Sequence, residues 1–291
     1  MNDNKISVEK VNNFVTIIRI AYEHGDEFPF FLSSDHHADS VKCEREILRN
    51  HLEESKERGA KNLFFGDTYD LMQGRHDRRS APEDLKDEYK RSDYLDAVSE
   101  DVADFYRPYA ENTIGFGLGN HETSVIKNTG HNPLNTLIDK LSKENPNIMR
   151  WGYRGFIFFR FEHVNGGGRF TKKLYFHHGS GGTAPVTKGV LKTGRRSVYL
   201  PDADIICTGH THNEWYFPLD RLRVNSHGKV YYDKQIHLQL PSYKRDGDGK
   251  GPPVAGWAVE SEFSPQGIGS WFIKFKVANG KATITPEPIT H

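Results

Sequence analysis

Short apolar runs recur along the chain, and five of them are followed closely by acidic, amide or imidazole side chains. Short apolar runs between turn signals are typical of buried β-strands. If such strands are parallel, the polar segments behind them converge on one edge of a sheet. The five pairs are Phe28–Leu32 with Asp35-His36-His37, Leu63–Phe65 with Gly66-Asp67-Thr68-Tyr69-Asp70, Ile114–Leu118 with Gly119-Asn120-His121-Glu122, Leu174–Phe176 with His177-His178-Gly179, and Ile205–Cys207 with Gly209-His210-Thr211-His212.

Apolar residues at helical spacing predict helices between these strands in the first half of the chain. The first helix is expected over residues 40–58 and ends at Gly59, a residue that favours helix C-termini. It connects two predicted strands, so we expect a β-α-β unit with parallel strands. A capping-box pattern at residues 80–83 predicts a long amphipathic helix that continues to Phe105. Another helix is expected to begin at Asn132.

Beyond residue 149 the pattern is mainly that of β-strands. Runs at 156–161 and 173–176 flank a triple-glycine turn, which predicts a hairpin. A short basic helix is expected near 186–192. The five polar segments come from both halves, so we expect one domain over residues 1–291. The other predicted strands are 15–20, 203–207, 215–217, 229–232, 237–240, 256–259, 271–277 and 282–284, with a loop over 246–253.

Composition narrows the classes of function. The chain has 39 basic and 39 acidic residues, so no overall field attracts nucleic acids or membranes. Two cysteines, Cys43 and Cys207, make no disulfide framework and fit a reducing compartment. Residues 1–10 contain no apolar signal core, and no apolar stretch approaches the ~20 residues of a membrane span. A cytoplasmic protein without a membrane span is therefore expected.

The five polar segments resemble, in the same order, the motifs of the calcineurin-like metallophosphoesterases: D-x-H, G-D-x-x-D, G-N-H-[DE], H-G and G-H-x-H. Any one of them is common by chance at a turn or strand end, whereas five in order behind apolar runs are not. The resemblance implies a four-layer α/β-β/α sandwich, in which two mixed sheets are flanked by helices. It also implies two divalent metal ions. Manganese is favoured, with iron, zinc, nickel or magnesium as alternatives, because carboxylate, amide and imidazole donors suit such cations.

The resemblance also implies a role for each site residue. Asp67 is expected to bridge the two metals, because a carboxylate can offer an anionic oxygen to both. His121 is expected to protonate the leaving group, with Asp70 as its partner. His178 is preferred to His177 because it stands in the H-G pair, and the other register remains open. The first metal would bind Asp35, His37, Asp67 and His212, and the second would bind Asp67, Asn120, His178 and His210.

The implied reaction is hydrolysis of a phosphoester by direct in-line attack of a metal-bridging hydroxide, with His121 as general acid and no covalent intermediate. The substrate is less defined. Leu71 and Met72 follow Asp70 where protein Ser/Thr phosphatases carry D-R-G, which argues against that branch. The segment from Gly66 to Leu71 is more similar in sequence to the corresponding motif of nuclease-like members and of UDP-diacylglucosamine pyrophosphatases.

Two basic clusters lie on loops expected at the ligand edge of the sheet, where they would bind phosphates that flank the scissile one or would simply be solvated. Four aromatic residues could stack on bases or belong to the core and rim. The basic residues are Arg75, Arg78 and Arg79, then Lys188, Lys192, Arg195 and Arg196, and the aromatic ones are Tyr69, Trp151, Tyr153 and Tyr199.

A phosphodiesterase acting on a nucleic acid or a nucleotide-like ester is therefore the leading function. The alternatives are a phosphomonoesterase, a nucleotide-sugar or lipid pyrophosphatase, and a non-catalytic metal-binding scaffold. The excursion at about 75–110 could form a cap over the site, a dimer surface or ordinary core. The sequence does not decide between a monomer and a dimer.

Overall fold

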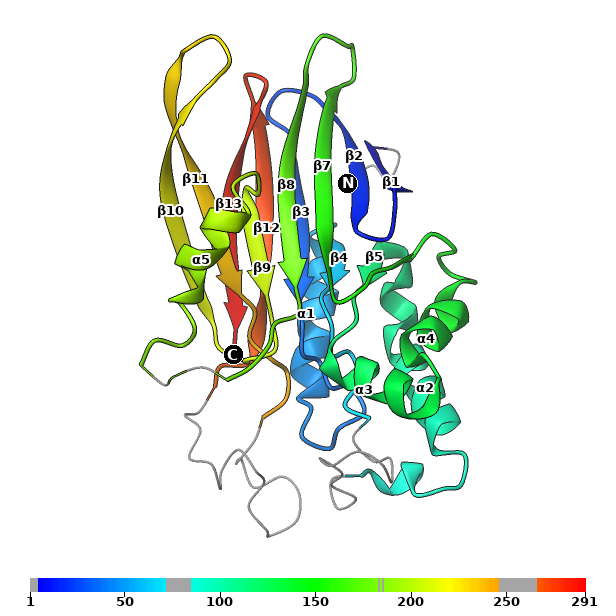
Figure 1. The fold of residues 1–291 in the computed structure, drawn as a ribbon. Coiled ribbons are helices and arrows are strands. Elements are labelled where there is room, and N and C mark those ends of the chain that lie inside the picture. Colours follow the sequence, from blue (N-terminus) through cyan, green and yellow to red (C-terminus); the bar gives the residue numbers. More distant parts are fainter. Residues whose placement is uncertain (1–4, 72–84, 183, 185, 246–265) are drawn as a thin grey trace.

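Two mixed β-sheets stack face to face in the computed structural model, which describes residues 5–71, 85–182, 184, 186–245 and 266–291 (Figure 1). The seven-stranded sheet has the order β1-β2-β7-β8-β9-β11-β10, and the six-stranded sheet has the order β13-β12-β3-β4-β5-β6. The strands are β1 Ile6–Lys10, β2 Val15–Tyr22, β3 Glu27–Ser33, β4 Lys61–Phe64, β5 Thr113–Phe116, β6 Met149–Arg150, β7 Arg154–His163, β8 Arg169–His177, β9 Ile205–Thr208, β10 Trp215–Val224, β11 Val230–Gln239, β12 Gly269–Ala278 and β13 Lys281–Thr290. The helices are α1 Arg45–Glu57, η3 Asp87–Tyr89, α2 Tyr94–Tyr106, η4 Arg107–Asn112, α3 Asn120–Thr129, α4 Pro133–Leu141 and α5 Lys192–Tyr199.

Parallel pairing in each sheet brings the five motif loops together. Strands β3, β4, β5 and β6 pair in parallel, as do β8, β9 and β11, whereas β1, β10 and β13 close the edges as antiparallel partners. Strands β3, β4, β5, β8 and β9 therefore end at the same end of the sandwich, near α3 in Figure 1. Carboxyl ends of parallel strands are where α/β folds collect functional side chains.

Alternation along the central strands divides their side chains between two cores. Phe30 and Leu32 of β3 point between the sheets, where the Phe30 ring packs 4.8 Å from that of Phe159. Phe31 points to the other face, into the cluster beneath α1, α2 and α4. This period of two is what a sheet buried on both faces requires.

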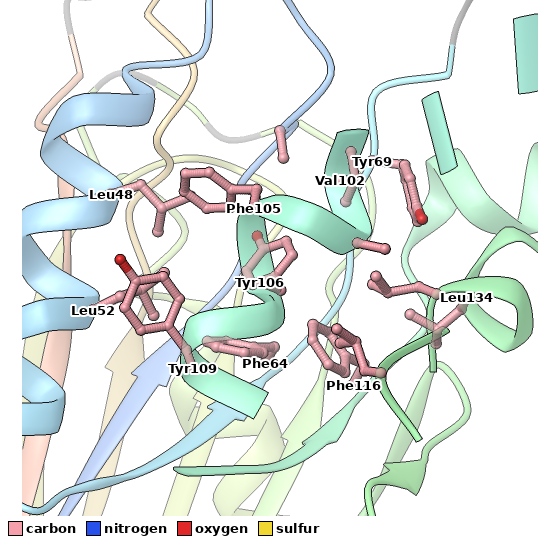
Figure 2. Close-up of a cluster of buried hydrophobic side chains, with 14 of the residues drawn as sticks. Leu48, Leu52, Phe64, Tyr69, Val102, Phe105, Tyr106, Tyr109, Phe116 and Leu134 are labelled. Atoms are coloured by element: carbon pink, nitrogen blue, oxygen red, sulfur yellow. The ribbon is translucent and has the colours of Figure 1, made fainter. Parts of the chain in front are cut away.

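Helices cover the outer face of each sheet and complete four layers. Figure 2 shows Leu48 of α1, Val102 and Tyr106 of α2, and Leu134 of α4 in one buried cluster with Phe64 of the six-stranded sheet. On the seven-stranded sheet, a smaller cluster of Tyr175, Ala203 and Ile206 lies on the face beneath α5. The expected two-sheet sandwich with flanking helices is confirmed. That the chain forms one domain stays a prediction.

Several helix predictions were wrong in position. Helix α1 begins at Arg45 rather than at residue 40, because the backbone N–H of Glu44 donates to Tyr243 O at 2.8 Å and the preceding residues form turns. The helix predicted near 186–192 is a series of turns through Gly189, whose φ of 82° is not helical, and α5 follows it. Helix α3 was missed because it buries few apolar residues.

Two strand predictions also differ from the structure. The strands predicted at 229–232 and 237–240 are one strand, β11, and β1 was not predicted.

The excursion at 75–110 is not one long helix. Its capping-box pattern at 80–83 lies outside the described residues, as do the predicted loop at 246–253 and strand at 256–259. The part that is described contains the short η3 and then α2, which begins only at Tyr94. The apolar face of α2, which includes Val98 and Val102, is buried in the core beneath the helices. This segment is therefore core at least from Tyr94 onward.

Candidate metal centre

Left-handed backbone is concentrated in the motif loops. Only eight described non-glycine residues have a positive φ, and five of them are predicted metal ligands. An L-residue in this region is disfavoured by roughly 1–2 kcal/mol, and such conformations persist where the surrounding structure enforces them, often at functional sites. The five are Asp35 (55°), His37 (47°), Asp67 (49°), His210 (73°) and His212 (54°).

Main-chain hydrogen bonds tie the motif loops to one another. The N–H of Asp35 donates to Gly66 O, and that of His37 donates to Asp67 O, each at 3.0 Å. On the other sheet, the N–H of Gly209 donates to His178 O at 2.9 Å. These contacts hold neighbouring motif loops of each sheet in register with one another.

Asp35, His37 and His212 form a first group of donors. One ligand atom from each lies within 4.8 Å of those of the other two, and Asp35 Oδ1 is 3.4 Å from His212 Nε2. Asp35 Oδ1 and His37 Nε2 are buried and have no hydrogen-bond partner among the described residues. Leaving buried polar atoms unpaired costs about 1–3 kcal/mol each. A cation between them would satisfy both.

Asp67, His178 and His210 form a second group, completed by Asn120. His178 Nδ1 lies 3.0 Å from Phe65 O, so the ring proton belongs there and the Nε2 lone pair faces the site. That Nε2 is 3.1 Å from both Asp67 Oδ2 and Asn120 Oδ1, and His210 Nδ1 is 2.6 Å from the same amide oxygen. Acceptor atoms that converge at such distances require a proton or a cation among them.

The electrostatic environment of His178 also favours a positive charge at this site. Burial by itself would lower the pKa of this imidazole, but the carboxylates of Asp67 and Asp35 outweigh burial and raise the pKa to about 10. In the absence of a metal, the imidazole would thus take up a proton to offset the two carboxylates. The site attracts positive charge, and its Asp and His groups could hold metal ions.

Asp67 lies at the centre of the constellation. Its Oδ1 accepts the backbone N–H of His121 at 3.0 Å, while Oδ2 faces His178. Its loop is fixed by Glu122, a fully buried carboxylate that accepts N–H bonds from Gly119 at 2.8 Å and Tyr69 at 3.0 Å. No role was predicted for Glu122, although it occupies the last position of the G-N-H-[DE] motif.

His121 contacts Asp70, but through an unexpected atom. His121 Nδ1 lies 2.5 Å from the Asp70 backbone carbonyl and 3.6 Å from its carboxylate Oδ1. The same Oδ1 is 3.0 Å from His37 Nδ1 and 2.8 Å from Lys244 Nζ. Burial opposes ionisation of Asp70, but Lys244 and His37 hold the pKa of this carboxyl well below its usual range. Sequence reasoning missed Lys244, because it belongs to no motif and only the fold brings it here.

His121 also belongs to a third group with metal-binding geometry. One ligand atom each of His37, Asp70 and His121 lies within 4.8 Å of the other two. The His37 and His121 rings are edge to face, 4.7 Å apart. Geometry alone therefore leaves two roles for His121, that of a ligand and that of a proton donor.

Two neighbouring histidines do not face the donor groups. His36 is buried between Ser33 Oγ and the Tyr106 hydroxyl, each 2.5 Å from one of its ring nitrogens. His177 accepts the backbone N–H of Gly179 at 2.9 Å. The structure thus brings His178 rather than His177 beside Asp67.

The predicted substrate residues are less well placed. Arg75, Arg78 and Arg79 lie outside the described residues. Arg196 is turned toward the sheet, where it donates to Thr208 Oγ1 at 3.3 Å, and Lys188 and Arg195 are exposed. Among the aromatic residues, Tyr69 is fully buried and Trp151 is 6% exposed. Tyr153 is half-buried, whereas Tyr199 on α5 is 62% exposed. Tyr69 is therefore excluded as a base-stacking residue.

Gly119 is required for space rather than for conformation. Its φ of −110° suits any residue, but a Cβ at this position would lie 2.0 Å from Asp67 Oδ1. We expect Gly119→Ala to displace Asp67, to lower the free energy of unfolding of the metal-free protein by about 1–3 kcal/mol, and to weaken Mn²⁺ binding. Urea unfolding and calorimetric titration with Mn²⁺ measure the two effects. Gly194→Ala on α5 is the matched control, because nothing lies within 4 Å of its Cβ position. Wild-type Mn²⁺ affinity in Gly119→Ala would contradict the close approach.

The stacked mixed sheets, the outer helices and the five motif loops at one end form the α/β-β/α sandwich that the resemblance to calcineurin-like metallophosphoesterases implies. No protein-family model matches the sequence, and no curated protein does.

Three solved structures show similarity at low identity. Vps29 of Chaetomium thermophilum has a TM-score of 0.36 and 10% identity over 91% of this chain and 96% of that chain. A conserved uncharacterized protein of Streptococcus pneumoniae, a predicted phosphoesterase, has a TM-score of 0.32 and 9% identity over 91% and 99%. GAP50, the anchor in the inner membrane complex of Plasmodium, has a TM-score of 0.42 and 12% identity over 91% and 84%. At these similarities no activity or partner transfers to this chain.

Within the described part of the chain, no helix combines the length and the apolar character that a membrane crossing needs.

Proposed function

We propose that this protein is a metal-dependent phosphodiesterase with two divalent cations, manganese being favoured. The observation that carries the proposal is the pair of donor groups, Asp35/His37/His212 and Asp67/His178/His210, at the same end of the sandwich. Asp67 is the residue we assign to both cations. Asn120 would complete the second set through its amide oxygen, which is 3.1 Å from His178 Nε2.

Two bound cations would supply Lewis-acid stabilisation of the phosphoryl oxygens and a nucleophile from water at neutral pH. The residues supply the geometry. Asp67 is oriented by the His121 N–H, and His178 is held in one tautomer by Phe65 O. Fixing ligands in this way before the substrate arrives is how a protein limits reorganisation during the reaction.

We assign to His121 the proton for the departing oxygen. Its Nδ1 is occupied by the Asp70 carbonyl, which leaves Nε2 on the side of Asp67, 3.8 Å from Oδ2. Nε2 is the ring atom from which a leaving group could take a proton. Asp70, itself paired with Lys244, would fix the orientation of His121.

A diester is favoured as substrate, in the form of a nucleic acid or a nucleotide-like ester. Leu71 stands where the phosphoprotein phosphatase motif would continue with arginine, and it is buried. A phosphomonoesterase and a pyrophosphatase use the same donor set, so the assay must separate them.

The test compares bis-p-nitrophenyl phosphate with p-nitrophenyl phosphate, each with added Mn²⁺ and with the bound metal quantified. We expect the diester to have the higher kcat/KM by at least about tenfold, a difference of about 1.4 kcal/mol in transition-state stabilisation. Preference for the monoester would replace the proposal with a phosphomonoesterase. Full metal occupancy without turnover of either ester would indicate a metal-binding scaffold.

A further inference from the structure

A cavity of about 620 Å³ lies between the turn before β2, the start of α4 and the segment from β6 to β7. This volume is within the range of about 300–1,000 Å³ that is typical of small-molecule sites. Two of its lining residues adjoin motif segments in the sequence. Leu118 precedes the Gly119-Asn120-His121 motif by one residue, and His177 is adjacent to His178.

The lining combines aromatic rings, guanidinium groups and amides without any carboxylate among the described residues that form it. Phe14 is 55% exposed at the rim, and the Arg154 guanidinium lies 6.0 Å from the centre of its ring. Arg150 is paired with Asp139, whereas Arg154 has no carboxylate partner among the described residues. The side chains of Asn13 and Asn135 add groups that both donate and accept hydrogen bonds, whereas the Asn132 oxygen caps α4 by accepting the N–H groups of Leu134 and Asn135.

Tyr153 separates the cavity from the metal centre. Its ring lies 5.3 Å from both the His177 and the His178 rings, nearly perpendicular to each. Its hydroxyl donates to Gly179 O at 2.8 Å, so the ring is fixed in place. A ligand in the cavity would therefore be separated by one aromatic ring from the predicted metal ligand His178.

We propose that this cavity is a nucleoside subsite, which holds the base and sugar of the diester while the phosphate lies at the metal centre. Phe14 offers a face on which a base can stack, and such stacking tolerates different bases because each has a π-face. The amides offer partners to base edges, and Arg154 lies where it can contact the sugar-phosphate. The inference rests on the proposed phosphodiesterase function and adds the chemical class of the group that is recognised.

The experiment uses two esters with the same leaving group, thymidine 5′-(p-nitrophenyl phosphate) and methyl p-nitrophenyl phosphate, with the Mn²⁺-loaded protein. We expect the ratio of their kcat/KM values to favour the nucleoside ester. In Phe14→Ala this ratio should fall about tenfold, mainly through a higher KM for the nucleoside ester. Arg154→Gln should change it in the same direction. Phe217→Ala on β10, 37% exposed and distant from the cavity in sequence and sheet order, is the matched control and should leave the ratio unchanged.

Binding of thymidine itself, followed by calorimetry on the metal-free protein, separates the two proposals because it needs no turnover. Weaker thymidine binding in Phe14→Ala than in Phe217→Ala supports the subsite, even if the wild type hydrolyses neither ester. If the wild type hydrolyses both esters equally and thymidine does not bind, the subsite is overturned and the phosphodiesterase assignment stands. An unchanged ester ratio in both Phe14→Ala and Arg154→Gln would also overturn it.

Discussion

Asp67→Asn is expected to empty both metal positions together. Asp67 Oδ2 is 3.1 Å from His178 Nε2, and the carboxylate also interacts electrostatically with His37 and His121. The amide removes one negative charge from the centre of the donor groups. Loss of an outer partner of a metal ligand typically costs about 10–100-fold in metal affinity, so loss of the bridging anion should exceed about 100-fold for each ion. Metal content by mass spectrometry and Mn²⁺ titration measure this directly.

The protein should remain folded in this variant. Asparagine keeps an oxygen that can accept the His121 N–H, a bond of 3.0 Å in the structure. Asp204→Asn is a suitable control, because Asp204 is another shielded carboxylate that accepts a backbone N–H, from Lys173 of β8 at 2.8 Å, and it lies just before β9, outside the motif loops. Loss of one metal with full retention of the other would assign Asp67 to a single ion. Equal occupancy in wild type and variant would refute the bridge.

His121→Ala should reduce turnover without loss of metal. Positioned general acids contribute about 10²–10⁴-fold to rate, and we expect a decrease in kcat within this range. The loss should shrink for esters with a p-nitrophenyl leaving group, which departs without a proton, and should be largest for alkyl esters. A series of leaving groups of increasing pKa, measured with the wild type and the variant, provides this comparison.

Metal content of His121→Ala decides between its two geometric roles. His37, Asp70 and His121 also form a group that could hold a cation. If His121 is a ligand, metal should be lost together with activity, and the decrease in rate should not depend on the leaving group. His131→Ala provides the control, because His131 lies in no motif and its Nε2 contacts only Thr136 Oγ1, at 3.3 Å, among the side-chain contacts described.

Sequence reasoning was most successful where a motif coincided with a strand end. Apolar runs before Asp35 and Asp67 gave parallel strands, and parallel strands must bring their carboxyl ends together. Sequence order and spacing were therefore enough to predict that the motif segments meet at one edge of the sheet, whereas the choice of individual side chains came from the family resemblance. The assignment of each residue to a particular metal came from family resemblance and stays a prediction.

The positions of some side chains near the site could not be predicted from the sequence, because they depend on contacts between distant segments. Lys244 reaches Asp70 because residues 242–243 are bonded to the Asp35 carbonyl, a contact across more than 200 residues of chain. Arg196 was expected at the site because it is basic and near two motifs, but its helix packs on the sheet. Charge in a loop says nothing about the direction in which a side chain will point.

The main-chain hydrogen bonds of the motif loops determine at which stage of folding the metal centre forms. Asp35 is bonded to Gly66 on its own sheet and, through its carbonyl, to Tyr243 near the other end of the chain. Contacts between residues so far apart in sequence form late, because closing long loops costs entropy before any contact compensates for it. Metal ions should thus bind the nearly complete fold and stabilise it by mass action, rather than nucleate it. The order of events in the cell would be folding first and metal loading second.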